Sequence, residues 1–366
     1  MSTRVRILAA ITIAAACALA VPARAQLVPP PPDQPDLTID ASLRALTIDS
    51  LATAIDRQYV FPDVGKQVAK TLRERSKKGR YDSITSAKAF NDTLNSELRA
   101  LAHDLHLRTH YYHAPVPQFG GQNTPPSDEE RAVYVADARR RNYGLDRVQR
   151  LPGNVGYIEL RGFESSAEAG VQAQAAMQTL AYCDALIFDL RRNGGGDPNM
   201  IVLFLSYLYD GDERVHVNDF YQREGNHTEE YWTTTTVPGP RFAGKPVYVL
   251  TSSRTGSAAE EFAYDIKNLK RGTLVGETTA GGANPGGYAR LNDHFVAFIA
   301  GGRAINPVSK TNWEGVGVTP DVKVETAEAL KTAHVAAVTA LLDKATDADR
   351  KASLGRALEA AKSGAN

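Results

Sequence analysis

Cysteine is nearly absent from this sequence, which has only Cys17 and Cys183 among 366 residues. Cys17 lies in an N-terminal segment that we expect to be removed, as described below. A mature chain with one cysteine cannot close an intrachain disulfide, so its stability must come from a packed core. Cys183 lies next to the apolar run 185–190, which favours a small buried side chain over a nucleophile.

An excess of charge of either sign is also absent. The 42 Lys and Arg residues balance the 42 Asp and Glu residues. A nucleic acid or an anionic membrane surface would require a large basic patch, so the composition argues against both as partners. The apolar run Ile7 to Val21 is too short to cross a bilayer comfortably, so we expect no integral membrane span.

Residues 1–25 have the pattern of a secretory signal peptide. Two arginines precede the apolar run, and an A-x-A cleavage site, Ala23-Arg24-Ala25, ends the segment. The mature protein is therefore expected to be exported, either periplasmic or secreted. The alternative is a lipoprotein, because Cys17 follows three alanines, although the usual leucine three residues before the cysteine is missing.

The N-terminal part of the mature chain is predicted to be a tether and a small helical domain. Residues 26–36 are proline-rich and should form an extended tether without a fold. Residues 37–113 contain three stretches with apolar residues at helical spacing, which predicts three amphipathic helices. Residues 114–150 are polar and are expected to be a linker that holds one helix, near 128–142.

Strand patterns alternate with helix patterns from residue 151 to residue 326, which indicates an α/β core. Short apolar, β-branched runs predict strands near 155–160, 185–190, 215–221, 247–250, 273–275, 288–291 and 295–299. Helices are predicted near 167–180 and 200–209, and from residue 258 onward. A helix near 327–344 and a polar, alanine-rich tail make up the C-terminal part, 327–366.

The stretch from Lys245 to Gly272 carries the first chemical signal. A buried strand is followed by a polar turn and by a helix that begins at Ala258. Ser257 thus lies at a helix N-terminus, where its hydroxyl could attack a carbonyl carbon while the Ala258 amide stabilises the oxyanion. The alternative is that Ser257 only caps the helix, with Glu260 completing a capping box.

Two glycine clusters follow predicted strands. Gly194, Gly195 and Gly196 come directly after the strand near 185–190, where backbone amides could form an oxyanion hole. They could also form only a tight turn, and the spacing of a phosphate-binding loop is not present. Gly281 and Gly282 belong to a second glycine-rich loop, which could line a substrate cleft or simply connect two strands at the surface.

Five blocks, in order along the chain, carry a resemblance to a known family. They are Y-V-F-P-D (59–63), D-L-H-L (104–107), D-L-R-R-N-G-G-G (189–196), T-S-S-R-T-G-S-A-A-E with G-E-T-T-A-G-G-A (251–260, 276–283) and N-W-E-G-V-G-V-T-P-D-V (312–322). The set resembles the tail-specific, or C-terminal processing, serine peptidases, which include the tricorn core protease and the interphotoreceptor retinoid-binding protein modules. The resemblance implies a crotonase-like ββα core and Ser257 as nucleophile. It also implies an oxyanion hole from the amides of Gly195 and Ala258, with the neighbouring glycines of both clusters lining the substrate site.

The sequence departs from part of this family. Serine–lysine processing peptidases carry a lysine in the loop after the nucleophile helix, in G-K-G, whereas the matching loop here reads Gly281-Gly282-Ala283. They also usually insert a PDZ domain before the core, and the interval between His113 and Gly153 is too short for one. The chain resembles the tricorn and retinoid-binding branch instead, which implies His106 as base and Glu314 as the acid that orients it.

This assignment is chemically sound. An imidazole with a pKa near neutrality can take the proton of a serine, and a carboxylate stabilises the imidazolium that forms. The tricorn protease has a serine before the histidine, but this chain has Leu105 there. A fourth catalytic residue is therefore missing or comes from elsewhere, for instance from Ser253 or Thr255.

His106 has a second interpretation as a metal ligand. His103, His106, His110 and His113 are spaced by 3, 4 and 3 residues, so one continuous helix would place all four on one face, as in a zinc site. Apolar and polar residues alternate from Leu105 onward, however, which favours a strand that would split the histidines between two faces. We therefore expect no metal ion and no other cofactor.

Together these observations predict a secreted serine endopeptidase that hydrolyses protein or peptide substrates, with its active site between the two domains. The alternative is a catalytically weak binder of hydrophobic ligands, like the retinoid-binding modules. Intact Ser257, His106 and Glu314 favour the enzyme. A purely structural scaffold is hard to reconcile with two glycine-lined loops, and the sequence assigns no oligomeric state.

Overall fold

The computed structural model of the chain describes residues 30–31, 33–117 and 127–364. The expected signal peptide, with Cys17, lies outside these residues. Within the described ranges, no helix combines the length and the apolar character needed to reach across a bilayer.

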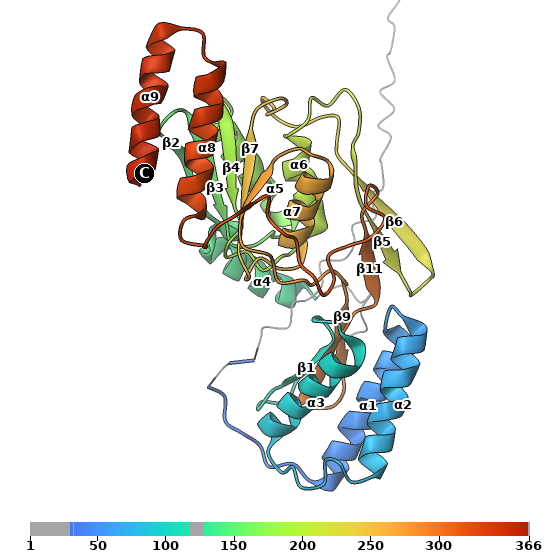
Figure 1. The fold of residues 1–366 in the computed structure, drawn as a ribbon. Coiled ribbons are helices and arrows are strands. Elements are labelled where there is room, and N and C mark those ends of the chain that lie inside the picture. Colours follow the sequence, from blue (N-terminus) through green and yellow to red (C-terminus); the bar gives the residue numbers. More distant parts are fainter. Residues whose placement is uncertain (1–29, 32, 118–126, 365–366) are drawn as a thin grey trace, which may run out of the picture.

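The helices and strands follow one another in a mixed order. The α-helices are α1 (Ala41–Gln58), α2 (Pro62–Lys77), α3 (Ala87–Ala102), α4 (Asp128–Arg140), α5 (Ser166–Thr179), α6 (Pro198–Ser206), α7 (Ala258–Asn268), α8 (Ala329–Lys344) and α9 (Ala348–Ser363), and a short 3-10 helix, η1 (Asn142–Gly144), follows α4. The strands are β1 (Arg108–Tyr111), β2 (Leu145–Leu151), β3 (Val155–Leu160), β4 (Ala185–Asp189), β5 (His216–Gln222), β6 (His227–Trp232), β7 (Val247–Thr251), β8 (Thr273–Gly276), β9 (Gly287–Arg290), β10 (Phe295–Ile299), β11 (Gly302–Ile305) and β12 (Val322–Lys323). They form a larger body around a six-stranded sheet and a smaller body that contains α1 to α3 (Figure 1).

The six-stranded sheet has the order β12-β8-β7-β4-β3-β2. Neighbouring strands from β12 to β3 are parallel, and β2 pairs antiparallel with β3 at one edge. Helices α5, α6 and α7 pack on one face, and α8 and α9 on the other. Burial on both faces explains the continuous apolar runs of β3, β4 and β7. The α/β core predicted from the sequence is confirmed, and Cys183 is buried in it.

The smaller body is built from two distant parts of the chain. Helices α1 to α3 lie where their periodicity predicts them and pack on the sheet β1-β10-β9. Strands β9 and β10 come from residues 287–299, inside the segment expected to belong to the core. Phe295, Ala297 and Ile299 alternate along β10 and are buried among the helices. The N-terminal domain expected as helical and continuous, 37–113, is therefore completed by a hairpin from the core segment.

A third sheet, with the order β11-β5-β6, lies beside the larger body. β5 matches the strand predicted near 215–221, but β6 and β11 were not predicted. β6 is mostly polar and exposed, so it offers little of the apolar alternation from which a strand is recognised.

Three segments differ from the expected domain boundaries. β2 lies within the expected linker, 114–150, and only its two end residues are buried, so its apolar signal is weak. The expected C-terminal tail forms α9, which begins with a side-chain cap from Asp347 and packs on α8. Part of the expected tether is fixed in place, because the Gln34 side chain donates to the Tyr111 carbonyl and accepts from the His113 amide, each at 2.8 Å.

Helix α7 carries two carboxyl groups into the core. Glu261 and Asp265 are both buried, and no cation neutralises either within the described part of the chain. Asn218 Nδ2 donates to Glu261 and Asn306 Nδ2 donates to Asp265, each at 3.1 Å. Burial raises the pKa of Glu261 to about 8 and the pKa of Asp265 well above its usual value. Glu261 is therefore mostly protonated in the folded chain at neutral pH, and Asp265 keeps its proton to a higher pH than an exposed aspartate does.

Replacing both acids, Glu261→Gln with Asp265→Asn, should flatten the pH dependence of stability. A raised pKa means that the folded chain binds more protons than the unfolded chain, so Glu261 lowers the free energy of unfolding as the pH rises from 4.5 to about 8. Asp265 acts in the same direction, because its pKa is also raised. Each group contributes up to about 1.4 kcal/mol per pH unit while it is protonated only in the folded state. Urea unfolding at several pH values measures the slope. A double variant whose stability falls as steeply as that of the wild type would contradict a protonated pair.

Candidate active site

Ser257 lies where the turn after β7 enters α7. Its backbone has φ 52° and ψ −124°, a conformation that L-residues adopt only at a cost. The Thr255 hydroxyl donates to the Leu190 carbonyl at 2.8 Å, and the Gly256 amide donates to the Asn193 carbonyl at 3.0 Å. The turn is thus tied to the segment after β4, so the central sheet fixes the strained position of Ser257.

Glu260 joins Ser257 to the second glycine cluster. Its side chain is fully buried and accepts four hydrogen bonds, from the amides of Ser257 (2.9 Å), Gly281 (2.6 Å) and Gly282 (2.9 Å) and from the hydroxyl of Thr279 (2.5 Å). Burial raises the pKa of Glu260, and these bonds oppose the rise because they favour the ionised form. The Glu260 half of the expected capping box is present, whereas the Glu260 amide donates to the Ser257 carbonyl and not to its hydroxyl. The same carboxylate also positions the loop.

The other side of this loop is held by the segment around Glu314. The Trp313 indole donates to the Gly282 carbonyl at 2.9 Å, and the Gly315 amide donates to the Gly281 carbonyl at 2.8 Å. Gly281 has φ +91°, and a Cβ there would lie 3.0 Å from the amide nitrogen of Gly317. Close backbone packing therefore requires glycine at this position.

His106 lies in the turn between α3 and β1. His103 ends α3 in the left-handed conformation, with φ 53°, and His110 lies in β1. The four histidines therefore do not share a helix face, as the alternation after Leu105 indicated.

Asp104, which the sequence analysis did not select, sets the conformation of this turn. It is buried, and its two oxygens accept four hydrogen bonds, from the amides of His106 (2.7 Å) and Leu107 (3.1 Å), the Tyr59 hydroxyl (3.0 Å) and Asn284 Nδ2 (3.1 Å). Tyr59 belongs to the block Y-V-F-P-D and Asn284 to the second glycine cluster. The position of Asp104 in D-L-H-L, two residues before the histidine, is the signal that could have identified it.

The ring of His106 packs directly on Gly282. A Cβ on Gly282 would lie 2.7 Å from the ring carbon Cε1, so a side chain there would displace the imidazole. Nδ1 is buried and has no hydrogen-bond partner among the described residues. Burial lowers the pKa of His106, Asp104 opposes this effect, and Arg108 adds to it. The neutral ring, which can accept a proton, therefore predominates at neutral pH.

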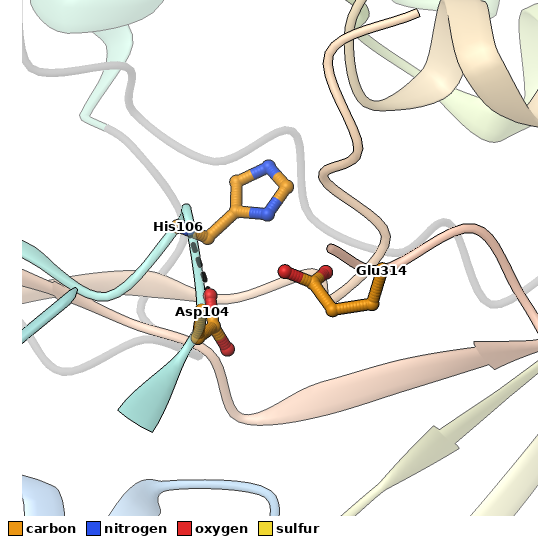
Figure 2. Close-up of side chains that lie close together, drawn as sticks. All are labelled: Asp104, His106 and Glu314. Carbon is orange, nitrogen blue, oxygen red and sulfur yellow. Dashed lines mark hydrogen bonds between the residues drawn. The ribbon is translucent and has the colours of Figure 1, made fainter. Parts of the chain in front are cut away.

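Glu314 lies beside His106, with its carboxylate on the side of the imidazole (Figure 2). The ligand atoms of Asp104, His106 and Glu314 all lie within 4.8 Å of one another. Backbone amides hold the Glu314 carboxylate, those of Ala283 (2.6 Å), Asn284 (3.0 Å) and Leu105 (3.3 Å). Burial raises the pKa of Glu314 to about 7, and the nearby Asp104 adds to this.

The same three side chains are poorly suited to bind a metal ion. Both oxygens of Asp104 and both oxygens of Glu314 already accept hydrogen bonds from the protein. A cation would have to displace buried donors, which would then lose their acceptors. The carboxylates of Asp104 and Glu314 are therefore better suited to hold the segment around His106 in place than to bind a metal ion.

The first glycine cluster forms a tight turn against Ser257. A Cβ on Gly195 would lie 2.8 Å from the Cβ of Ser257, and a Cβ on Gly196 would lie 1.9 Å from the Phe163 carbonyl oxygen. The Gly195 amide, an expected oxyanion donor, donates to Asn193 Oδ1 at 2.8 Å in this structure. No hydrogen bond from the Ala258 amide is found in the part of the chain that the structure describes. Of the two expected donors, only Ala258 is thus unoccupied.

Ser257 and His106 both border the second glycine cluster. No hydrogen bond joins the Ser257 hydroxyl to the His106 ring among the described residues; the connection runs through Glu260 and Gly282. The Thr255 hydroxyl is engaged with the Leu190 carbonyl. Asp104 holds the turn of His106 through the backbone amide of that residue.

Comparison with known proteins gives two family matches. Residues 154–324 match Peptidase family S41, and residues 37–138 match the N-terminal domain of Peptidase_S41 in eukaryotic IRBP.

Two curated relatives match about half of the chain. The C-terminal processing peptidase, chloroplastic, of Tetradesmus obliquus is 27% identical over 177 residues, which cover 47% of this chain and 35% of the relative. The Carboxyl-terminal-processing peptidase 2, chloroplastic, of Arabidopsis thaliana is 30% identical over 190 residues, which cover 48% of this chain and 34% of the relative. The chain thus spans about a third of the length of these relatives.

A solved structure shows the same fold. The structure of mature CPAF complexed with lactacystin has a TM-score of 0.55 at 11% sequence identity, and the match covers 86% of this chain and 99% of that chain. The predicted fold, a crotonase-like core with a helical N-terminal region, agrees with this likeness.

Glu260→Ala should destabilise the chain and loosen the second glycine cluster. The change leaves the amides of Ser257, Gly281 and Gly282 without their acceptor, and each unpaired buried group costs about 1–3 kcal/mol. We expect a loss of at least about 3 kcal/mol in urea unfolding, and a smaller loss for Glu260→Gln, which keeps one carbonyl oxygen. Hydrogen exchange of the two glycine amides provides the local measurement. Unchanged exchange in Glu260→Ala would show that the carboxylate does not hold the loop.

Proposed function

Because the chain belongs to peptidase family S41, we propose that it is a serine peptidase in which Ser257 is the nucleophile and His106 the base. The observation that carries this proposal is the arrangement around one carboxylate. Glu260 accepts from the amide of Ser257, at its strained helix N-terminus, and from the amide of Gly282, on which the His106 ring packs.

Each protein group has a defined role in the proposed reaction. The neutral His106 ring accepts the Ser257 proton as the serine oxygen attacks the carbonyl carbon of the scissile bond. The ionised form of Glu314 stabilises the imidazolium, which then gives its proton to the leaving amine. Water hydrolyses the acyl-enzyme by the same route. Hydrogen bonds of this kind are often absent without substrate and form in the substrate complex, so the Ser257–His106 bond is expected there.

The oxyanion would be stabilised by the Ala258 amide and the positive end of α7. The Gly195 amide can contribute only after the Asn193 side chain releases it. Gly194 would leave the backbone open to an extended substrate, since it carries no side chain and a Cβ there would meet no atom within 4 Å.

We propose further that the substrates are proteins or peptides cleaved near their C-termini, after export of the enzyme. C-terminal processing is the activity in the names of the two curated relatives, and it supports this substrate class. The arginines, apolar run and A-x-A site within residues 1–25 support export to the periplasm or the medium.

Ser257→Ala and His106→Ala should each lower kcat/KM for a cleaved peptide by roughly 10³-fold or more, since each removes one partner of the proton transfer. Ser83→Ala is the control, because Ser83 is an exposed serine outside the candidate site. Cleavage should also persist with a chelator present. Full activity of either alanine variant would refute the assignment, and loss of activity with chelator would reopen the metal interpretation.

The pH dependence of kcat/KM should report Glu314 rather than His106 on its acid side. Glu314 has a raised pKa of about 7, so it is neutral below this pH and ionised above it, whereas the pKa of His106 is lowered. Activity should therefore rise with an apparent pKa near 7. Glu314→Gln should remove this limb and lower the plateau by roughly 100-fold or more, because the amide cannot stabilise the imidazolium. A variant with the wild-type profile would show that Glu314 does not support the base.

A further inference from the structure

The sheet β1-β10-β9 has a second face, opposite to the helices, that begins beside His106. Arg108 and His110 lie on β1 at alternate positions from His106, and Arg108 is the cross-strand partner of Phe298 on β10. Phe298 is in turn the partner of Tyr288 on β9. The side chains of His110, Phe298 and Tyr288 are partly exposed, and Arg108 is exposed. This face, called here the aromatic face, continues the surface on which the candidate base lies.

Phe298 is the centre of the aromatic face. Its ring centroid lies 5.8 Å from that of His106 and 5.3 Å from that of Tyr288. The guanidinium carbon of Arg108 lies 5.8 Å from the same ring. One aromatic side chain thus touches the base, a cation and a second aromatic ring, so whatever contacts Phe298 lies next to all three.

The guanidinium of Arg108 is held in place but not neutralised. Its Nε donates to His110 Nε2 at 3.2 Å, and no carboxylate pairs with it within the ranges that the structure describes. His110 can accept this bond because burial and Arg108 together lower its pKa to about 4, which leaves the ring neutral. Arg290, on the same face, is paired with Asp293. The terminal nitrogens of Arg108 are therefore available to an external acceptor.

The direction of the proposed reaction places part of the substrate over this face. His106 protonates the leaving amine, so the fragment that departs must lie on the His106 side of the scissile bond. An extended peptide advances about 3.3 Å per residue. A residue roughly two to four positions after the scissile bond would therefore reach Phe298 and Arg108.

We propose that Arg108 binds a carboxylate of the leaving fragment, while Phe298 and Tyr288 pack against an apolar side chain beside it. This inference rests on the proposed function, since it takes the side of the leaving fragment from His106. A planar guanidinium offers paired N–H donors that match a carboxylate, and such charge-assisted bonds are stronger than neutral ones. The carboxylate can come from a free C-terminus or from an Asp or Glu side chain. Arg108 is thereby a specificity-determining residue.

The test measures binding to a Ser257→Ala protein, so that cleavage does not interfere. The probe is a fluorescein-labelled pentapeptide, Gly-Ala-Ala-Phe-Ala, made with a free C-terminal carboxylate and with a C-terminal amide. Fluorescence anisotropy should show about 5-fold or tighter binding of the free acid. A third peptide, amidated and with Glu as its last residue, separates the two sources, because it regains affinity only if a side-chain carboxylate is accepted.

Arg108→Gln in the same background should reduce the ratio of the two affinities to about 1, and Arg108→Lys should retain part of it. Arg99→Gln is the matched control, since Arg99 is also an exposed arginine of the smaller body. Equal binding of acid and amide before the change, or a preference that survives Arg108→Gln, would overturn the inference. An Arg108-dependent preference in a protein that cleaves no peptide would instead refute the proposed function while leaving the carboxylate site in place.

Discussion

The buried carboxylate of Glu260 is the interaction on which the geometry of the site depends. An unpaired carboxylate in a protein interior is very costly, so its position is stable only where donors surround it. Here the donors belong to two separate elements, the N-terminus of α7 and the loop from Thr279 to Gly282. Each element satisfies part of the same charge, so neither can move without leaving buried groups unpaired. Ser257 and the support of the His106 ring are therefore held at a fixed separation, although no direct bond joins them.

Gly282 explains why the chain departs from the serine–lysine pattern. Serine–lysine processing peptidases carry a lysine at the centre of the matching G-K-G loop, but here that position is Gly282, and the Cε1 atom of His106 lies 2.7 Å from where a Cβ would be. The space that a lysine would occupy is filled by an imidazole delivered from the smaller body. A side chain at position 282 would collide with the imidazole, so the glycine there and the position of the His106 ring belong to one packing constraint.

Whether a feature could be predicted from the sequence depends on how far apart in the sequence the residues that determine it lie. The position of Ser257 could be predicted because a strand, a turn and a helix follow one another locally. Helices α1 to α3 could be predicted because their apolar residues repeat at helical spacing. His106 and Glu314 entered only through the family resemblance, since the bond between their segments joins residues 209 positions apart. Asp104 and the second role of Glu260 were missed because the partners of a buried polar side chain are set by tertiary packing. The pairing of β9 and β10 with β1 in the smaller body was missed for the same reason, because a strand pattern does not indicate with which other strand it pairs.

The smaller body is tied to the larger one near His106, the proposed base. The chain leaves the larger body, adds β9 and β10 to the smaller sheet, and returns to form β11. At the same boundary, the Arg223 guanidinium donates to the carbonyls of Tyr59 (2.6 Å) and Asp56 (2.9 Å). The Tyr59 hydroxyl in turn donates to Asp104, which sets the turn of His106. The contacts between the two bodies thus continue through Tyr59 and Asp104 to the turn that holds the imidazole, while Glu260 keeps Ser257 and Gly282 together.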